Sequence, residues 1–134
     1  MRRVMKLDVE EFWAAALTPD KRLIRTECLF RGTVDACLIH PRDLFRFAIA
    51  NNASALIVAH NHPSKNLEPS VEDIAVNRNL LLAAELLQIP LLDHLIITEE
   101  GYTSFLEKGL MTLDLRPRLR RKTRERATDS KVHE

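Results

Sequence analysis

A short apolar run, Ser54–Ala59 (SALIVA), restricts the fold of this chain more than any other stretch. The run is brief, contains β-branched residues and is almost free of polar ones, which is typical of a strand buried on both faces in the middle of a sheet. Between Ser70 and Gln88, apolar residues then recur at a spacing that suits a helix, at Ile74, Leu80, Leu81, Ala84 and Leu87. We therefore expect a central strand followed by a long helix that lies across the sheet.

Short strands and helices alternate in the rest of the chain. Turn residues separate strands that we expect at Glu11–Leu17, Arg22–Phe30, Thr33–His40, Leu91–Thr98 and Tyr102–Leu106. The first of these contains three alanines, which favour a helix, but its Phe-Trp pair and the turn after it favour a hairpin strand. Pro41 opens a helix over residues 41–52. The pattern predicts one α/β domain over residues 1–115, with a mixed sheet and a helix after each of two central strands.

The composition is that of a folded cytoplasmic protein. A chain of 134 residues with 46% apolar and 29% charged residues suits a single core. The N-terminus does not have the pattern of a signal peptide, and the longest apolar stretch is interrupted by polar residues and is too short for a membrane span. Cys28 and Cys37 are too few for a disulfide framework and are expected to be reduced thiols.

The charges are distributed unevenly along the chain. Residues 1–115 carry 12 basic and 16 acidic residues, a net charge of −4, whereas residues 116–134 carry 8 and 3, a net charge of +5. The basic tail between Arg116 and Arg126 could contact nucleic acid or another acidic partner, because clustered cations release counterions from phosphates. It contains no aromatic residue to stack on bases. A solvated, flexible tail is therefore an equally valid interpretation.

Two histidines follow the central strand. Because residues i and i+2 of a strand project to the same side, His60 and His62 can present both imidazoles to one point. Asp73, in the first turn of the next helix, could be a third ligand, and two histidines with one carboxylate leave a fourth position for water in a catalytic zinc site. A plainer alternative remains, since Ser70 and Asp73 also have the spacing of a helix capping box and a lone His-x-His often occurs by chance.

The order His60-x-His62, seven residues, Ser70, two residues and Asp73 resembles the HxHx7SxxD motif of JAMM (JAB/MPN) metalloproteases. Within that group, residues 32–64 and 68–97 look like the bacterial RadC family, and the resemblance covers roughly residues 8–107. It implies a cytidine-deaminase-like, three-layer α/β/α fold and one zinc ion per chain. It also implies hydrolysis of peptide or isopeptide bonds, which some members of the group perform.

The resemblance also implies roles for individual residues. His60, His62 and Asp73 would hold zinc, and the pKa of a bound water would fall from about 16 to about 7. Glu27 matches the general acid–base glutamate by position, with Glu10 and Glu11 as weaker alternatives, and Ser70 would donate to the oxyanion.

Three features of the chain depart from the family pattern or lie outside its site. Lys65 stands where typical RadC sequences have glycine, and the chain is expected to be a stand-alone catalytic domain without the N-terminal helix-hairpin-helix segment of many RadC proteins. His40 and His94 match family positions but are expected to be hydrogen-bonded structural residues.

The alternatives to a hydrolase are a nucleic-acid-associated protein that uses the basic tail and a metal-free MPN scaffold.

Overall fold

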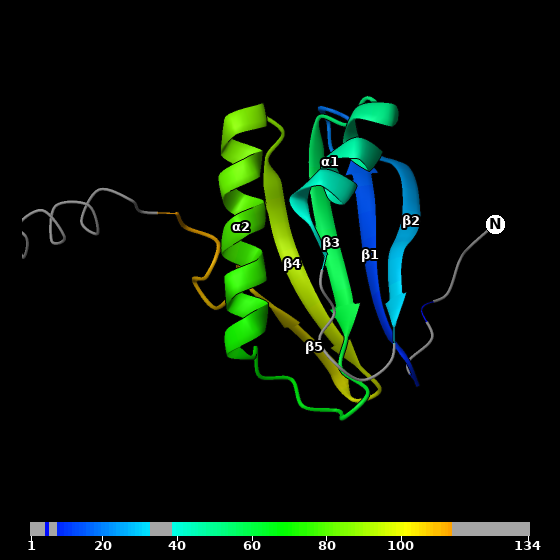
Figure 1. The fold of residues 1–134 in the computed structure, drawn as a ribbon, viewed down its shortest axis with the longest axis vertical. Helices are drawn as coiled ribbons and strands as arrows, with labels where there is room; N and C mark the ends of the chain where they lie inside the picture. The colour runs from blue at the N-terminus through cyan, green and yellow to red at the C-terminus, as the bar shows by residue number, and fades with distance from the viewer. Residues whose placement is uncertain (1–4, 6–7, 33–38, 114–134) are drawn as a thin grey trace, which may run out of the picture.

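A mixed sheet of five strands forms the centre of the molecule (Figure 1). The computed structural model describes Met5, residues 8–32 and residues 39–113. The strands are β1 Glu10–Leu17, β2 Leu23–Gly32, β3 Ala55–Asn61, β4 Leu91–Thr98 and β5 Gly101–Ser104, and the helices are α1 Pro41–Ala50 and α2 Val71–Leu87. The strand order is β2–β1–β3–β4–β5, in which β3 and β4 are parallel and the other neighbours are antiparallel. The predicted α/β class and mixed sheet are confirmed.

The SALIVA run forms β3, which lies in the middle of the sheet between β1 and β4. Leu56 and Val58 are fully buried, whereas Ile57 and Ala59 on the opposite face are partly exposed. The predicted central position is confirmed, but complete burial on both faces is not, because one face is closed more tightly than the other.

Both helices pack on the same face of the sheet and contact each other (Figure 1). One apolar core joins them to the sheet, and it includes Leu44, Phe45, Leu56, Val58, Leu80 and Ala84. Residues 8–32 and 39–113 thus form two layers, and within them no element supplies the third layer that the family resemblance implies.

The stripe of α2 that meets the sheet is narrower than predicted. Its buried residues are Asn77, Leu80 and Ala84. Ile74 and Leu87, which the apolar spacing assigns to the same face, are 43% and 48% exposed, so the prediction is wrong for these two. Ile74 lies on the flank of the stripe by the 3.6-residue period, and Leu87 is the last residue of the helix. A polar side chain, Asn77, takes a core position in their place.

Other predicted elements are largely confirmed. The ambiguous segment is strand β1, α1 begins at Pro41, and β4 has the expected bounds. Strand β5 ends at Ser104, and the following Phe105 is a buried core residue. No helix in the described part of the chain is long and apolar enough to cross a membrane.

Several predictions fall outside the described residues. They include Cys37, most of the strand expected at residues 33–40, and the basic tail at residues 116–134. Ile39 and His40, which are described, do not belong to a strand.

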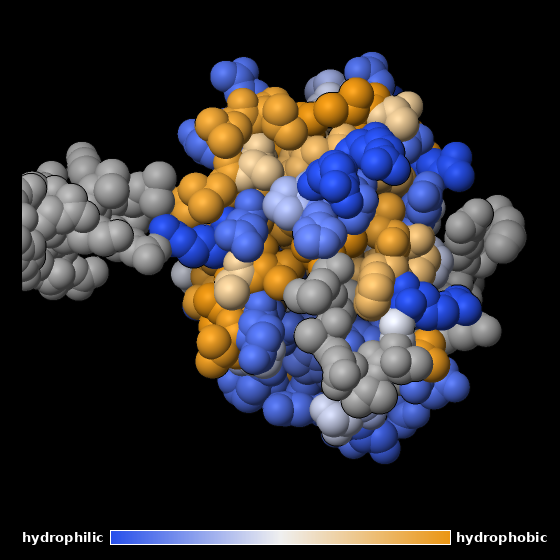
Figure 2. Space-filling view, in the orientation of Figure 1, coloured by the Kyte–Doolittle hydropathy of each residue, from blue (hydrophilic) through white to orange (hydrophobic). Residues whose placement is uncertain are grey.

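The helical face has an apolar end and a polar end (Figure 2). Exposed apolar side chains, Ile49, Leu86 and Leu87, lie at the carboxyl ends of the two helices. Hydrophilic residues gather at the other end, where β3 ends and α2 begins (Figures 1 and 2). His60 and His62 lie at this polar end.

Candidate metal centre

Three side chains meet where β3 ends and α2 begins. His60 is the next-to-last residue of β3, His62 directly follows the strand, and Asp73 lies in the first turn of α2. The Nε2 atoms of the two histidines are 3.1 Å apart. Asp73 Oδ1 is 3.1 Å from His60 Nε2, and Asp73 Oδ2 is 3.0 Å from His62 Nε2. One ligand atom from each of the three residues therefore lies within 4.8 Å of the others, as the His-x-His spacing predicts.

The loop between β3 and α2 makes a tight turn immediately after these histidines. The Lys65 N–H donates to the His62 carbonyl at 2.9 Å, and Lys65 has φ +70°. This left-handed conformation is easy for glycine and costs other residues about 1–2 kcal/mol. The left-handed backbone at Lys65 agrees with the glycine that the resemblance to RadC sequences predicts at this position. In this chain the Lys65 ammonium also lies 3.4 Å from the Glu99 carboxylate.

A capping box orients the carboxylate. The Asp73 N–H donates to Ser70 Oγ at 3.0 Å, and the Ser70 N–H donates to Asp73 Oδ2 at 2.8 Å. The capping interpretation of this pair is therefore confirmed. It is compatible with metal binding, because the same bonds hold the Asp73 side chain beside the two imidazoles.

The outer nitrogens of both histidines also have partners. His62 Nδ1 lies 2.7 Å from the Asn66 carbonyl oxygen, and His60 Nδ1 lies 2.9 Å from His94 Nε2. A carbonyl only accepts, so His62 Nδ1 carries a hydrogen, and its Nε2, which faces the Asp73 carboxylate, can hold either a proton that it donates to Asp73 or a cation. Hydrogen bonds of this kind fix the ring orientation of metal-binding histidines.

The electrostatics of the cluster favour a cation. Burial by itself raises the pKa of Asp73, but hydrogen bonds from His60 and His62 outweigh it and hold this pKa well below its usual range. The hydrogen bond to Asp73 raises the pKa of His62 above its usual value. Two imidazole nitrogens and a carboxylate are a donor set that zinc accepts. The residues present thus fit the metal that the motif implies.

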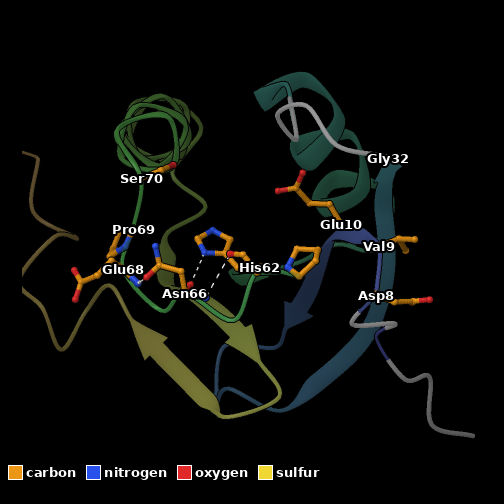
Figure 3. A pocket seen from close by; sticks show the side chains of 11 residues that line it. Asp8, Val9, Glu10, Gly32, His62, Asn66, Glu68, Pro69 and Ser70 are labelled. Carbon is orange, nitrogen blue, oxygen red and sulfur yellow. Dashed lines mark hydrogen bonds between the residues drawn. The ribbon is translucent and has the colours of Figure 1, made fainter.

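A cleft of about 660 Å³ opens beside the cluster (Figure 3). Its lining includes residues from β1 and from the loop before α2, among them Glu10, His62, Asn66 and Ser70. In Figure 3, Glu10 projects from β1 into the cleft, and His62 and Ser70 lie across it. Burial raises the pKa of Glu10, while His60 and His62 oppose this by lowering it. Glu10 is thus a carboxylate within electrostatic range of the histidines and Asp73.

Glu27, the glutamate that sequence position favours, is not brought to this cluster. On edge strand β2 it pairs with Ala14, four residues beyond Glu10 along β1, or roughly 13 Å at about 3.3 Å per residue. Its side chain is 41% exposed and lies 3.6 Å from Arg25. The antiparallel register explains the difference, because Gly32, rather than Glu27, stands opposite Glu10.

Glu11, the other alternative, points to the opposite face of the sheet from Glu10, as alternation along a strand requires. Its buried carboxylate accepts hydrogen bonds from Trp13 Nε1 at 2.7 Å and from Arg31 Nε at 2.9 Å. These contacts indicate a structural role for Glu11.

Comparison with known proteins agrees with the geometry. A family model described as the RadC-like JAB domain matches residues 1–110. The chain belongs to the RadC family. A UPF0758 protein of Symbiobacterium thermophilum is 44% identical over 110 residues, which are 82% of this chain and 47% of the relative. A UPF0758 protein of Xanthomonas euvesicatoria is 49% identical over 100 residues, 75% of this chain and 44% of the relative.

This RadC-like domain spans about half the length of the curated relatives it matches. The matched family region contains His60, His62, Asp73 and Glu10.

Proposed function

We propose that this RadC-like domain is a zinc-dependent hydrolase that cleaves peptide or isopeptide bonds. The observation that carries the proposal is the convergence of His60, His62 and Asp73 on one point beside an open cleft that also receives Glu10. Membership of the JAB domain family agrees with this chemistry. A metal-free scaffold would have no need for this donor set.

Each group in the cleft has a role in such a reaction. Zinc, when bound by the two histidines and Asp73, lowers the pKa of a coordinated water and polarises the substrate carbonyl. Glu10 takes the role that the sequence assigned to Glu27, because it lies in the cleft within electrostatic range of both histidines. Glu68, the other glutamate of the cleft lining, is 75% exposed and lies 3.9 Å from Lys108. The Glu10 carboxylate accepts a proton from the attacking water and returns one to the leaving amine, and its raised pKa suits this exchange.

Ser70 combines a structural role with a proposed catalytic one. Its Oγ accepts from the Asp73 N–H, and its hydroxyl hydrogen remains available to donate to the developing oxyanion. Ser70→Ala is expected to lower the free energy of unfolding by about 1 kcal/mol through loss of the cap. It is also expected to lower turnover by about 10² to 10³, with zinc still bound.

Urea unfolding, zinc content and single-turnover assays of Ser70→Ala separate these roles. Ser64→Ala is the matched control, because Ser64 lines the same cleft but caps no helix. Lower stability with full turnover would leave Ser70 as a cap alone and remove it from the catalytic proposal.

The proposed function is tested by metal content and metal-dependent cleavage. Protein purified without added metal is expected to contain about one zinc per chain and to cleave peptides or isopeptide-linked lysine peptides in a library. A chelator should abolish cleavage, zinc should restore it, and magnesium should not, because Mg²⁺ prefers an octahedral set of oxygen ligands. Failure of the wild type to take up zinc, even after reconstitution, would refute the hydrolase.

The second function class considered, nucleic-acid binding, stays a prediction. It depends on Arg116–Arg126, which lie outside the described residues. The cytoplasmic location also stays a prediction.

A further inference from the structure

A buried chain of hydrogen bonds leads from the metal cluster to the segment after β5. His60 Nδ1 lies 2.9 Å from His94 Nε2, and His94 Nδ1 lies 3.0 Å from Asn77 Oδ1. The Asn77 Nδ2 group then donates to the Leu110 carbonyl at 3.1 Å. His60, His94 and Asn77 are each no more than 2% exposed, so solvent does not compete for the two bonds that join these three side chains.

The chemistry of the last partner sets the direction of every bond in this chain. The Leu110 carbonyl can only accept, so the Asn77 amide nitrogen must face it and the Asn77 oxygen must face His94. That oxygen also only accepts, so the hydrogen of the His94 ring is on Nδ1. Burial between aromatic rings disfavours a charged imidazole, and the Nε2 atom of neutral His94 is therefore an acceptor.

These hydrogen-bond directions determine the tautomer of His60. An accepting Nε2 on His94 requires His60 to donate from Nδ1, so His60 Nε2, which faces His62 and Asp73, is the nitrogen whose lone pair a metal ion can take in place of a proton. We propose that His94 and Asn77 are positioning residues, which hold His60 in the tautomer that offers Nε2 to zinc. This inference rests on the zinc site of the proposed function and extends it to two residues on β4 and α2.

Packing alone is the competing explanation for His94. Its ring stacks on Phe105 with centroids 4.3 Å apart and meets Phe12 edge-on at 5.7 Å. A phenylalanine at this position preserves ring packing but removes the acceptor for His60, whereas a glutamine can offer an amide oxygen in place of Nε2. These two substitutions therefore separate packing from hydrogen bonding.

The test is the zinc affinity of the full chain, measured by competition with a chromophoric chelator. His94→Phe is expected to bind zinc about 10 to 100 times more weakly than the wild type, the usual effect of losing an outer partner of a ligand. His94→Gln is expected to recover part of this affinity. Phe105→Leu, which disturbs the stacking but no hydrogen bond of the chain, is expected to alter stability and leave zinc affinity unchanged. Wild-type zinc affinity in a folded His94→Phe protein would overturn the proposal.

Histidine NMR on the wild type provides a second test, which does not depend on whether a variant folds. Long-range ¹H–¹⁵N correlations of the zinc-loaded protein are expected to show His94 protonated at Nδ1 and bare at Nε2. A His94 ring protonated at Nε2 would reverse the chain and overturn the inference. Failure of the wild type to bind zinc would instead refute the proposed function, and the same spectrum of the zinc-free protein would still report the His94 tautomer.

Discussion

Replacing Glu10 by glutamine is expected to lower turnover by about 10² to 10⁴ while zinc stays bound. Glutamine keeps the size of the side chain and its hydrogen-bonding reach but cannot accept a proton at neutral pH. None of the three proposed ligands is altered, so zinc content should match the wild type. Single-turnover cleavage rates of zinc-loaded protein, together with metal analysis of the same samples, measure both quantities.

Glu27→Gln is the matched control for this substitution. Glu27 lies on the same sheet but contacts Arg25 at a partly exposed position on the edge strand. We expect turnover within about twofold of the wild type, since exposed ion pairs contribute little. The reverse result, with Glu27→Gln inactive and Glu10→Gln active, would restore the assignment made from sequence position and contradict the role of Glu10.

The cluster of His60, His62 and Asp73 could be predicted from sequence because it depends on local geometry. His60 and His62 share one strand end, and Asp73 follows after a single loop whose helix start is marked by Ser70. Alternation along a strand and the capping box are short-range rules, and both operate within fourteen consecutive residues. No knowledge of the rest of the fold is needed.

The proposed acid–base glutamate, Glu10, could not be assigned in this way because its position depends on strand register. Phe12 stands opposite His60 in the β1–β3 pair, so Glu10, two residues earlier on the same face, reaches the cluster. A shift of one residue would have placed Glu11 there instead. The sequence contains no signal for this pairing, although the alternation of Glu10, Phe12 and Ala14 indicates which acidic residue shares a face with the core.

His94 illustrates a further limit of sequence reasoning. The expectation of a hydrogen-bonded sheet residue is confirmed, but its partner is the proposed ligand His60 on the neighbouring parallel strand. Asn77, for which the spacing of apolar residues predicts no role, lies in the buried stripe of α2. Such polar contacts join three elements that only the tertiary structure brings together.

Replacing His62 by alanine is expected to remove zinc from the protein. Zinc binding to small protein sites is worth about 10–16 kcal/mol and is shared among a few ligands, so each contributes roughly 3 kcal/mol, or more than about 10² in affinity. The variant should therefore lose its metal during purification. It should also lose the thermal stabilisation by added zinc, which for the wild type is about 2.7 kcal/mol when zinc is present at about 100 times its dissociation constant.

His40→Ala is the control for a histidine outside the cluster. His40 is exposed at the start of α1 and makes no side-chain capping bond, so its loss should leave zinc content and zinc-dependent stabilisation unchanged. Metal analysis and thermal unfolding with and without zinc compare the two variants. If His62→Ala keeps its zinc, the ion is held elsewhere and the site at the end of β3 fails. If both variants lose it, the loss does not report on the ligands, and only loss confined to His62→Ala ties the metal to this end of the sheet.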